Sequence, residues 1–257
     1  MWKAIRIFVL LVILATVAQS AWLGKSRALS WQDPLRVALY PINGDGSAVT
    51  DGYLRSLTAE DFRAIESYMD GEAARQGLNL RHAVEVSLAQ PLANLPPPAP
   101  RQANAIQAIM WSLQLRYWAW RHDAVAGPKP HVRLFVVFFD PATHERLAHS
   151  TGMEKGLIGV INAFASRTMA GSNKVIVAHE LLHTLGATDK YDLATNQPAF
   201  PDGYAEPERT PRYPQEFAEL MGGRIPLSDT QAEIPHSLAQ TLIGARTATE
   251  IGWRKTP

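Results

Sequence analysis

One pentapeptide, His179-Glu180-Leu181-Leu182-His183, restricts what this chain can fold into more than any other stretch. On a helix, residues four positions apart lie on the same face, so both imidazoles can reach one point, as two ligands of a zinc ion must. Glu180 lies one position further round, where its carboxylate can reach a water on the metal without becoming a ligand. A helix that presents both histidines to a metal is therefore expected here.

The flanking residues predict the ends of this helix and a third ligand. Ser172 is the expected N-cap, and Gly186 is the expected stop because glycine adopts the left-handed conformation without a steric cost. The chain can then reverse and present Asp189, whose carboxylate could complete a three-ligand site. A buried helix with two ordinary histidines would not explain Glu180, since an unpartnered buried carboxylate is costly.

This pattern resembles the extended zinc signature of the metzincin metalloproteases, in the snapalysin-like variant with aspartate as third ligand. Further along, Glu219-Leu220-Met221-Gly222-Gly223 resembles the Met-turn of that family. The residue-level similarity covers about 172–225. It implies that Zn²⁺ is held by His179, His183 and Asp189, with Met221 packed beneath them.

The resemblance and the motif together predict a zinc-dependent endopeptidase that hydrolyses protein or peptide substrates, with Glu180 activating a zinc-bound water. The alternative is an exported zinc-binding module without proteolytic activity. Many metzincins carry a tyrosine after the Met-turn, where this chain has two glycines. Tyr204 and Tyr213 are candidate donors to the transition state, and plain loop packing is the alternative for both.

Other carboxylates compete with Asp189 for the third ligand position. Asp192 is expected to be a partner of a ligand or a loop cap. A later glutamate could serve instead, in the manner of gluzincins, and the candidates are Glu206, Glu208 and Glu216.

Residues 1–23 read as a signal peptide or an N-terminal membrane anchor. Lys3 and Arg6 precede a run, Ile7 to Ala18, that is apolar except for Thr16, and Ala18-Gln19-Ser20 resembles a cleavage site. The run to Leu23 is about 17 residues long, the short limit for spanning a bilayer. Both readings predict an extracytoplasmic protein: periplasmic and held at the inner membrane through this segment, or secreted.

Composition argues against nucleic acid as a partner and excludes cysteine chemistry. A formal net charge of +1 over 257 residues gives no electrostatic basis for binding nucleic acid. The absence of cysteine excludes disulfides and thiolate ligands.

The remaining pattern predicts an α/β (α+β) fold with a metzincin-like mixed, twisted sheet. Strands are expected at 35–42, 83–89 and 131–139. Helices are expected from a capping box at Thr58 and Asp61 to about Arg75, ending at Gly77, and at about 101–122. The second helix carries an apolar stripe expected to pack in the core, formed by Ile106, Ile109, Met110, Leu113, Tyr117 and Trp120.

Three further segments complete the expected organisation. Residues 145–151 are the expected edge strand above the substrate cleft, with His149 on the surface rather than on a metal, and 156–165 is a further strand. An amphipathic helix is expected at 237–252. The chain would then divide into a linker, 24–34, and one catalytic domain, 35–257, with an upper lobe (35–186) and a small irregular or helical lower lobe (187–257).

Overall fold

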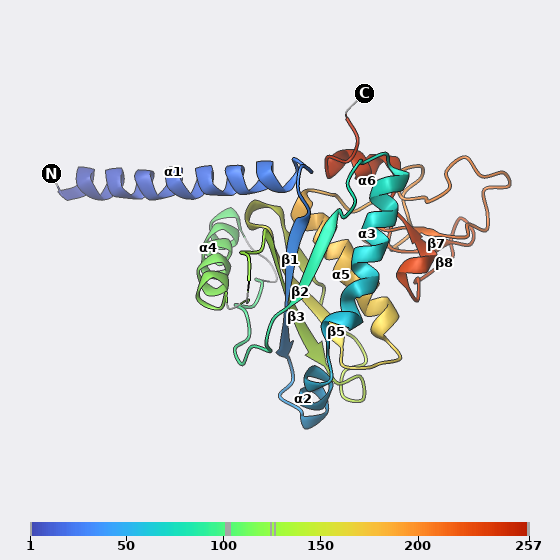
Figure 1. The fold of residues 1–257 in the computed structure, drawn as a ribbon, viewed down its shortest axis with the longest axis horizontal. Coiled ribbons are helices and arrows are strands. Elements are labelled where there is room, and N and C mark those ends of the chain that lie inside the picture. The colour runs from blue at the N-terminus through green and yellow to red at the C-terminus, as the bar shows by residue number, and fades with distance from the viewer. Residues whose placement is uncertain (1, 101–103, 124, 126, 256–257) are drawn as a thin grey trace.

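A five-stranded mixed sheet forms the centre of the computed structural model, which describes residues 2–100, 104–123, 125 and 127–255 (Figure 1). The strand order is β2-β1-β3-β5-β4. All neighbours are parallel except β4, which runs antiparallel to β5 at one edge. The strands are β1 (Leu35–Asn43), β2 (Val84–Leu88), β3 (Val132–Phe139), β4 (Thr151–Met153) and β5 (Ile158–Phe164).

Helices cover both faces of this sheet. Figure 1 shows α3 (Arg63–Arg75) and α5 (Ala170–Leu185) on one face, and α4 (Ala105–Arg121) on the other. The helix α2 (Ala48–Arg55) follows β1, and the 3₁₀ turns η1 (Ala59–Phe62) and η2 (Glu154–Gly156) lie before α3 and after β4. This is a three-layer α/β arrangement, as expected from the sequence.

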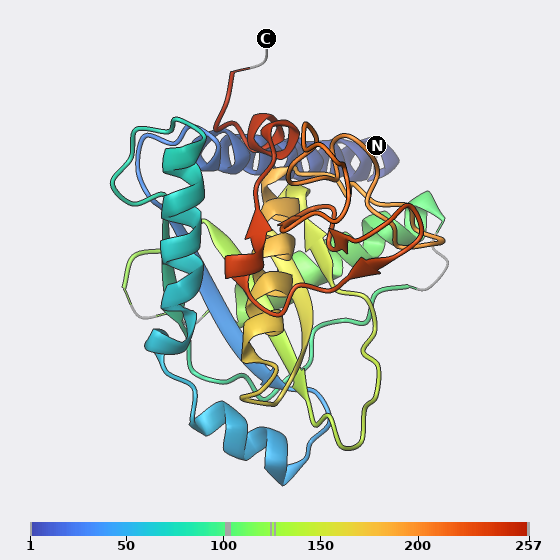
Figure 2. The same ribbon diagram turned by 90° about the vertical axis from the view of Figure 1, so that its right-hand side faces the viewer.

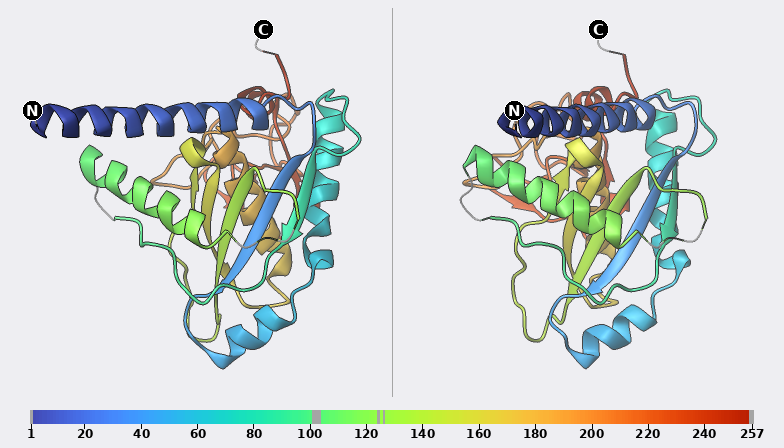
Figure 3. Two further views of the ribbon diagram at one scale, coloured as in Figure 1. Left: turned by 60° about the vertical axis from the view of Figure 1, so that its left-hand side comes forward. Right: turned by 90° about the vertical axis from the view of Figure 1, so that its left-hand side faces the viewer.

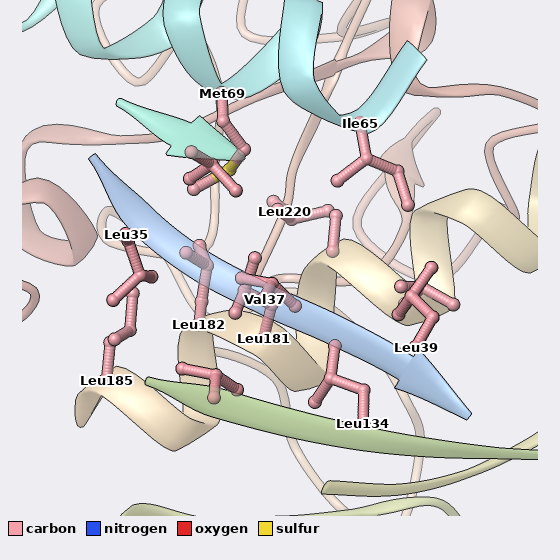
Figure 4. Packing of buried hydrophobic residues seen from close by; sticks show 14 of the residues in the cluster. Leu35, Val37, Leu39, Ile65, Met69, Leu134, Leu181, Leu182, Leu185 and Leu220 are labelled. Atoms are coloured by element: carbon pink, nitrogen blue, oxygen red, sulfur yellow. The ribbon is translucent and has the colours of Figure 1, made fainter. Parts of the chain in front are cut away.

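Strand β1 shows why the central strands are almost wholly apolar. Its alternate side chains point to opposite faces. One set, Leu35, Val37 and Leu39, packs with α3 and α5, as Figure 4 shows. The other set, Ala38, Tyr40 and Ile42, packs on the α4 side. Because helices cover both faces, a polar residue at either set would be buried, which explains the near-continuous apolar run in β3 as well.

The strands expected at 35–42, 83–89 and 131–139 are confirmed, as is the strand within 156–165. The capping box is present, since the Thr58 backbone N–H donates to the Asp61 carboxylate over 2.8 Å. It opens η1, which leads into α3. Helix α2 was not expected. Ser47 caps it by accepting from the Thr50 N–H over 3.1 Å. The cap residue directly follows the turn cluster Asn43–Gly46, so the sequence there indicated a turn rather than the start of a helix.

Helix α4 corrects the expected core packing at 101–122. It begins at Ala105, with Asn104 and Gln107 forming its capping box, and residues 101–103 lie outside the described part of the chain. The stripe expected in the core is instead 44–73% exposed at every position. The helix packs through Leu115 and Ala119, which lie off that stripe. The helical spacing of apolar residues correctly identified an apolar face of α4, but spacing alone does not determine which face packs on the sheet.

The edge strand is displaced from its expected place. Residues 145–150 form no regular strand, and the antiparallel edge pairing begins only at Thr151. The preceding segment still follows β5, because the Asn162 amide donates to the carbonyl oxygens of Ala148 (3.1 Å) and His149 (3.3 Å). The Asn162 side chain therefore makes the hydrogen bonds to this segment that backbone groups would make in a regular strand pair.

The C-terminal part contains no long helix, so the helix expected at 237–252 is wrong. Thr241–Leu242 pairs with Ala218–Glu219, and Gly244 then starts a short helix. Tertiary pairing thus breaks the helical pattern. The elements are β6 (Ala218–Glu219), β7 (Ile225–Pro226), β8 (Ala232–Glu233), η3 (Leu238–Gln240), β9 (Thr241–Leu242) and α6 (Ala245–Glu250).

The N-terminal segment is one helix, α1 (Trp2–Ala28), which projects from the body (Figure 1). It extends into the expected linker 24–34, and Ala28 and Trp31 are buried in the core. The Trp31 indole donates to the Ile251 carbonyl over 2.7 Å, which fixes the base of α1 to the C-terminal part. Within the described residues, no helix combines the length and the apolar content needed to cross a membrane.

The packing of β1 makes a stability prediction. Leu39 is buried between α3 and α5, so Leu39→Ala leaves a cavity and should lower the free energy of unfolding by about 2–5 kcal/mol. Val49→Ala, on the exposed side of α2, should change it by less than about 0.5 kcal/mol. Urea titrations followed by tryptophan fluorescence measure both. Equal losses would contradict the assigned packing.

Candidate metal centre

Helix α5 carries the histidine motif, and its ends are fixed by specific contacts. It begins at Ala170 with Met169 as N-cap, so the expected cap at Ser172 is wrong. The Asn173 amide instead ties the first turn to the end of β5, accepting from the Phe164 N–H (3.2 Å) and donating to its carbonyl (2.8 Å). Gly186 ends the helix at φ 105°, as expected.

The two imidazoles and one carboxylate converge on a single point. Asp189 Oδ1 lies 3.2 Å from His179 Nε2 and 3.1 Å from His183 Nε2. The imidazole centroids are 4.6 Å apart and the rings are nearly perpendicular, at 82°. The structure thus brings together the three residues that the sequence singled out as ligands.

Backbone carbonyls set the orientation of both rings. His179 Nδ1 lies 2.9 Å from the Leu220 carbonyl, and His183 Nδ1 lies 2.8 Å from the Ala187 carbonyl. A carbonyl can only accept, so each Nδ1 carries the proton and donates it. With Nδ1 as the donor to the backbone, Nε2 is the atom left to bind a metal ion or to share a proton with Asp189. Metal-binding histidines are held in this way.

The loop after α5 is anchored to the C-terminal helix. Glu250 accepts from the Thr188 N–H (3.0 Å) and from Lys190 Nζ (2.8 Å), while the Lys190 N–H donates to the Met221 carbonyl over 2.9 Å. Both neighbours of Asp189 are therefore fixed, and its carboxylate has little freedom to leave the histidines. This contribution of Glu250, 60 residues away along the chain, had no signal in the sequence.

Charge pairing lowers the pKa of Asp189. Burial would raise it, but hydrogen bonds from His179 and His183 and their charge outweigh burial. The pKa of His183 is raised: burial opposes its charge, and the contacts with Asp189 and the Ala187 carbonyl more than compensate. A metal ion at this point would replace the protons that these contacts now share.

Glu180 is a buried carboxylate with an unused oxygen. Its side chain faces the cavity, and Oε2 has no hydrogen-bond partner among the described residues. Burial raises its pKa, and the nearby histidines partly oppose that rise. The Gly152 backbone of β4 also lies next to this carboxylate and partly opposes the rise in its pKa.

The segment resembling a Met-turn lies against His179, one of the candidate ligands. Leu220 and Met221 supply the carbonyls that meet His179 and Lys190, and Met221 is fully buried. Glu219, also fully buried, holds the turn by accepting from the N–H groups of Gly222 and Gly244, both at 2.9 Å. Figure 2 shows these C-terminal segments gathered around α5.

A cavity of about 430 Å³ opens beside Glu180 and His179. One wall is α5, and another is the segment 147–150, the expected edge strand in sequence though not in regular structure. His149 is an exposed part of that wall, in keeping with its expected surface position. Both apolar and polar residues complete the cavity, including Leu220, Ile234, Asn196 and Arg224.

The two candidate tyrosines do not line this cavity. Their hydroxyls lie 2.7 Å apart, and Tyr213 donates to Asp229 over 2.9 Å. Tyr191 lines it instead, and its pKa is raised by burial, by the charge of Asp189 and by a hydrogen bond to that carboxylate. The sequence did place Tyr191 two residues after the third ligand, which is the signal that could have found it.

The competing carboxylates have other partners. Asp192 accepts from the N–H groups of Ala194 (3.0 Å) and Thr195 (2.8 Å), so it is a loop cap. Glu206 and Glu216 both pair with Arg209. None of the three, nor Glu208, lines the cavity.

The comparisons with protein families and with curated proteins found no relative of this chain. No protein-family model matches the chain, and no curated protein matches it either.

The contact between β4 and α5 makes a prediction at Gly152. A Cβ there would lie 2.5 Å from His183 Cβ and 2.8 Å from the Glu180 carbonyl. Gly152→Ala should therefore push the edge strand off α5, lower the free energy of unfolding by about 1–3 kcal/mol, and weaken Zn²⁺ binding.

The matched control is Gly52→Ala in α2, where a Cβ meets nothing within 4 Å. It should leave Zn²⁺ binding unchanged and add up to about 1 kcal/mol of stability. Urea titration and competition with a chromophoric chelator measure the two quantities. Normal stability and binding in Gly152→Ala would show that the two elements are less tightly packed than described.

Proposed function

We propose that this chain is a zinc-dependent endopeptidase of the metzincin type. The observation that carries the proposal is the approach of Asp189 Oδ1 to both histidine Nε2 atoms, at 3.2 and 3.1 Å. Ligand atoms about 2.0–2.1 Å from one zinc ion in a tetrahedron lie about 3.3 Å from each other. These two separations therefore fit one zinc ion with little rearrangement, and His179 also lines the cavity.

The chemistry of the donor set also favours zinc. Two imidazoles and one carboxylate, with a position left open, are typical of catalytic rather than structural zinc sites. When bound, the ion would lower the pKa of a water to about 7 and polarise a substrate carbonyl. Calcium and magnesium are poor alternatives because they prefer oxygen ligands.

Glu180 is the proposed general base and acid. With a metal ion bound, the Glu180 carboxylate, which lines the cavity, would accept a proton from the attacking water and would donate it to the leaving amine. A carboxyl whose pKa is raised by burial is better suited to both transfers than an exposed one. A module that only bound zinc would not need a carboxylate at this position, which argues against the non-proteolytic alternative.

Tyr191 is the proposed donor to the developing oxyanion. Tyr191 lines the cavity with Glu180 and lies near enough to Asp189 for that carboxylate to raise its pKa, so its phenol is the candidate to reach a carbonyl oxygen near the ion. The substrate is proposed to be an extended peptide along the outer edge of β4, whose inner edge alone is paired in the described sheet.

The proposed location is extracytoplasmic. Lys3 and Arg6 precede the apolar run of α1, as in an export segment or membrane anchor. Apolar side chains near the start of α1 support the same reading because they are 48–75% exposed: Trp2, Ile5, Ile7, Phe8 and Val9.

The first test concerns the ligands and the base. Purified wild-type protein should contain about one zinc per chain and cleave casein. Asp189→Ala should lose most of the zinc, whereas Asp192→Ala, a nearby carboxylate that caps a loop, should retain it. Glu180→Gln should keep the metal and lose at least about 10²-fold in kcat.

Two outcomes would reject the mechanism. Zinc retained in full by Asp189→Ala would remove Asp189 from the ligand set. Cleavage by Glu180→Gln at the wild-type rate would remove the general base.

The second test concerns the tyrosines. Tyr191→Phe should lower kcat by about 10²-fold and change KM little, because the donor acts on charge that develops only in the transition state. Tyr204→Phe should leave kcat unchanged, since its hydroxyl bonds to Tyr213. Zinc content is measured in both variants, so that a lost ligand contact is not mistaken for a lost donor. Wild-type kcat in Tyr191→Phe would place the donor elsewhere.

A further inference from the structure

Helix α4 presents a continuous apolar stripe to solvent. Six side chains at helical spacing are 44–73% exposed. They are Ile106, Ile109, Met110, Leu113, Tyr117 and Trp120. Soluble proteins rarely leave an apolar face of this length uncovered, so the stripe indicates a binding surface.

The opposite side of α4 already makes the contacts that a core helix needs. Leu115 and Ala119 are buried, and the Trp118 ring packs edge-on against Phe135, with centroids 4.8 Å apart. The Trp111 indole donates to the Pro97 carbonyl over 3.0 Å. The helix is therefore held on the sheet in one orientation, and its stripe cannot turn inward.

Helix α1 projects from the same side of the body. In Figure 1 both helices lie to the left of the sheet, and α1 extends past α4. Figure 3 shows α4 on that side, running obliquely below α1. The base of α1 is fixed by buried Ala28 and Trp31, so the relative position of the two helices is set by the body.

Between Ile7 and Ala18 the sequence of α1 is apolar except for Thr16, so this run places apolar residues on every side of the helix. Ile7, Phe8, Val9, Leu11 and Val12 fall on different faces and are 48–67% exposed. A single protein partner would cover one face of such a helix, whereas lipid covers every face. The medium that surrounds α1 would also meet the stripe of α4.

We propose that the exposed stripe of α4 lies in the interface of a lipid bilayer, into which α1 inserts beside it. The composition fits this occupant. Tyr117 and Trp120 are the residue types enriched at the membrane–water boundary, and the helix contains no Asp or Glu but ends at Arg121, which can meet anionic headgroups.

This arrangement fixes the orientation of the body. Helix α5, which carries the histidine motif, lies on the opposite face of the sheet from α4 (Figure 1). The bilayer would therefore contact the side of the sheet away from α5. The proposal concerns docking alone and holds whether or not the protein cleaves peptides.

The absence of cysteine allows a direct test with the full chain. Ile109→Cys and Tyr117→Cys, each on the stripe, are labelled with the environment-sensitive dye NBD. Leu193→Cys is the control, since Leu193 is also highly exposed but lies in the loop after α5. Each protein is mixed with vesicles of phosphatidylcholine and phosphatidylglycerol, and quenching by aqueous iodide is measured.

The labels at 109 and 117 should shift to the blue on vesicles, and their iodide quenching constants should fall at least about threefold, because an interfacial helix buries one face below the headgroups. The label at 193 should not change. Cosedimentation of the protein with unchanged quenching at 109 and 117 would mean that α1 alone binds lipid, and it would overturn the proposal. Protection without vesicles that rises with protein concentration would identify a second copy as the occupant and would overturn it too.

Discussion

The approach of one carboxylate to two imidazoles is the contact on which the rest of this structure depends. Asp189 can remain 3.1–3.2 Å from His179 and His183 only if α5 stops at Gly186 and the chain reverses at once. It also needs both neighbours of Asp189 to be held by Glu250 and Met221. The C-terminal part of the chain is built around that requirement. Its short strands and the short helix α6 provide carbonyls and a carboxylate at defined points rather than an independent core.

Burial and hydrogen bonding divide the acidic residues near this point into three roles. Asp189, paired with two histidines, has a lowered pKa and stays ionised. Glu180, buried with one oxygen free, has a raised pKa and is suited to proton transfer. Glu219, fully buried, accepts three hydrogen bonds from Gly222, Gly244 and Thr247 and holds the turn under the ligands. The same functional group thus serves as the proposed ligand, the proposed base and a structural anchor, according to its surroundings.

Each side of the sheet carries a feature that packing of the core does not require. On the α5 side lies the cavity that contains Glu180 and Tyr191, which we propose as a peptide cleft. On the α4 side lies an apolar stripe that the sheet does not need, because Leu115 and Ala119 already make the contact. The proposed bilayer contact and the proposed catalysis therefore use opposite faces of one rigid sheet.

The sequence by itself determined the local parts of this protein: the central strands, the histidine helix with its glycine stop, and the meeting of His179 and His183 on that helix with Asp189 just after it. These follow from spacing, since helical periodicity and a left-handed glycine act over a few residues. Only the tertiary structure decided which face of α4 meets the sheet, where the edge strand begins, and that 237–252 breaks into short pieces. It also decided that Tyr191, not Tyr204 or Tyr213, lines the cavity, and that Glu250 holds the loop that carries Asp189. Such choices depend on which distant surface is available for packing and hydrogen bonding, and no pattern within one segment records that.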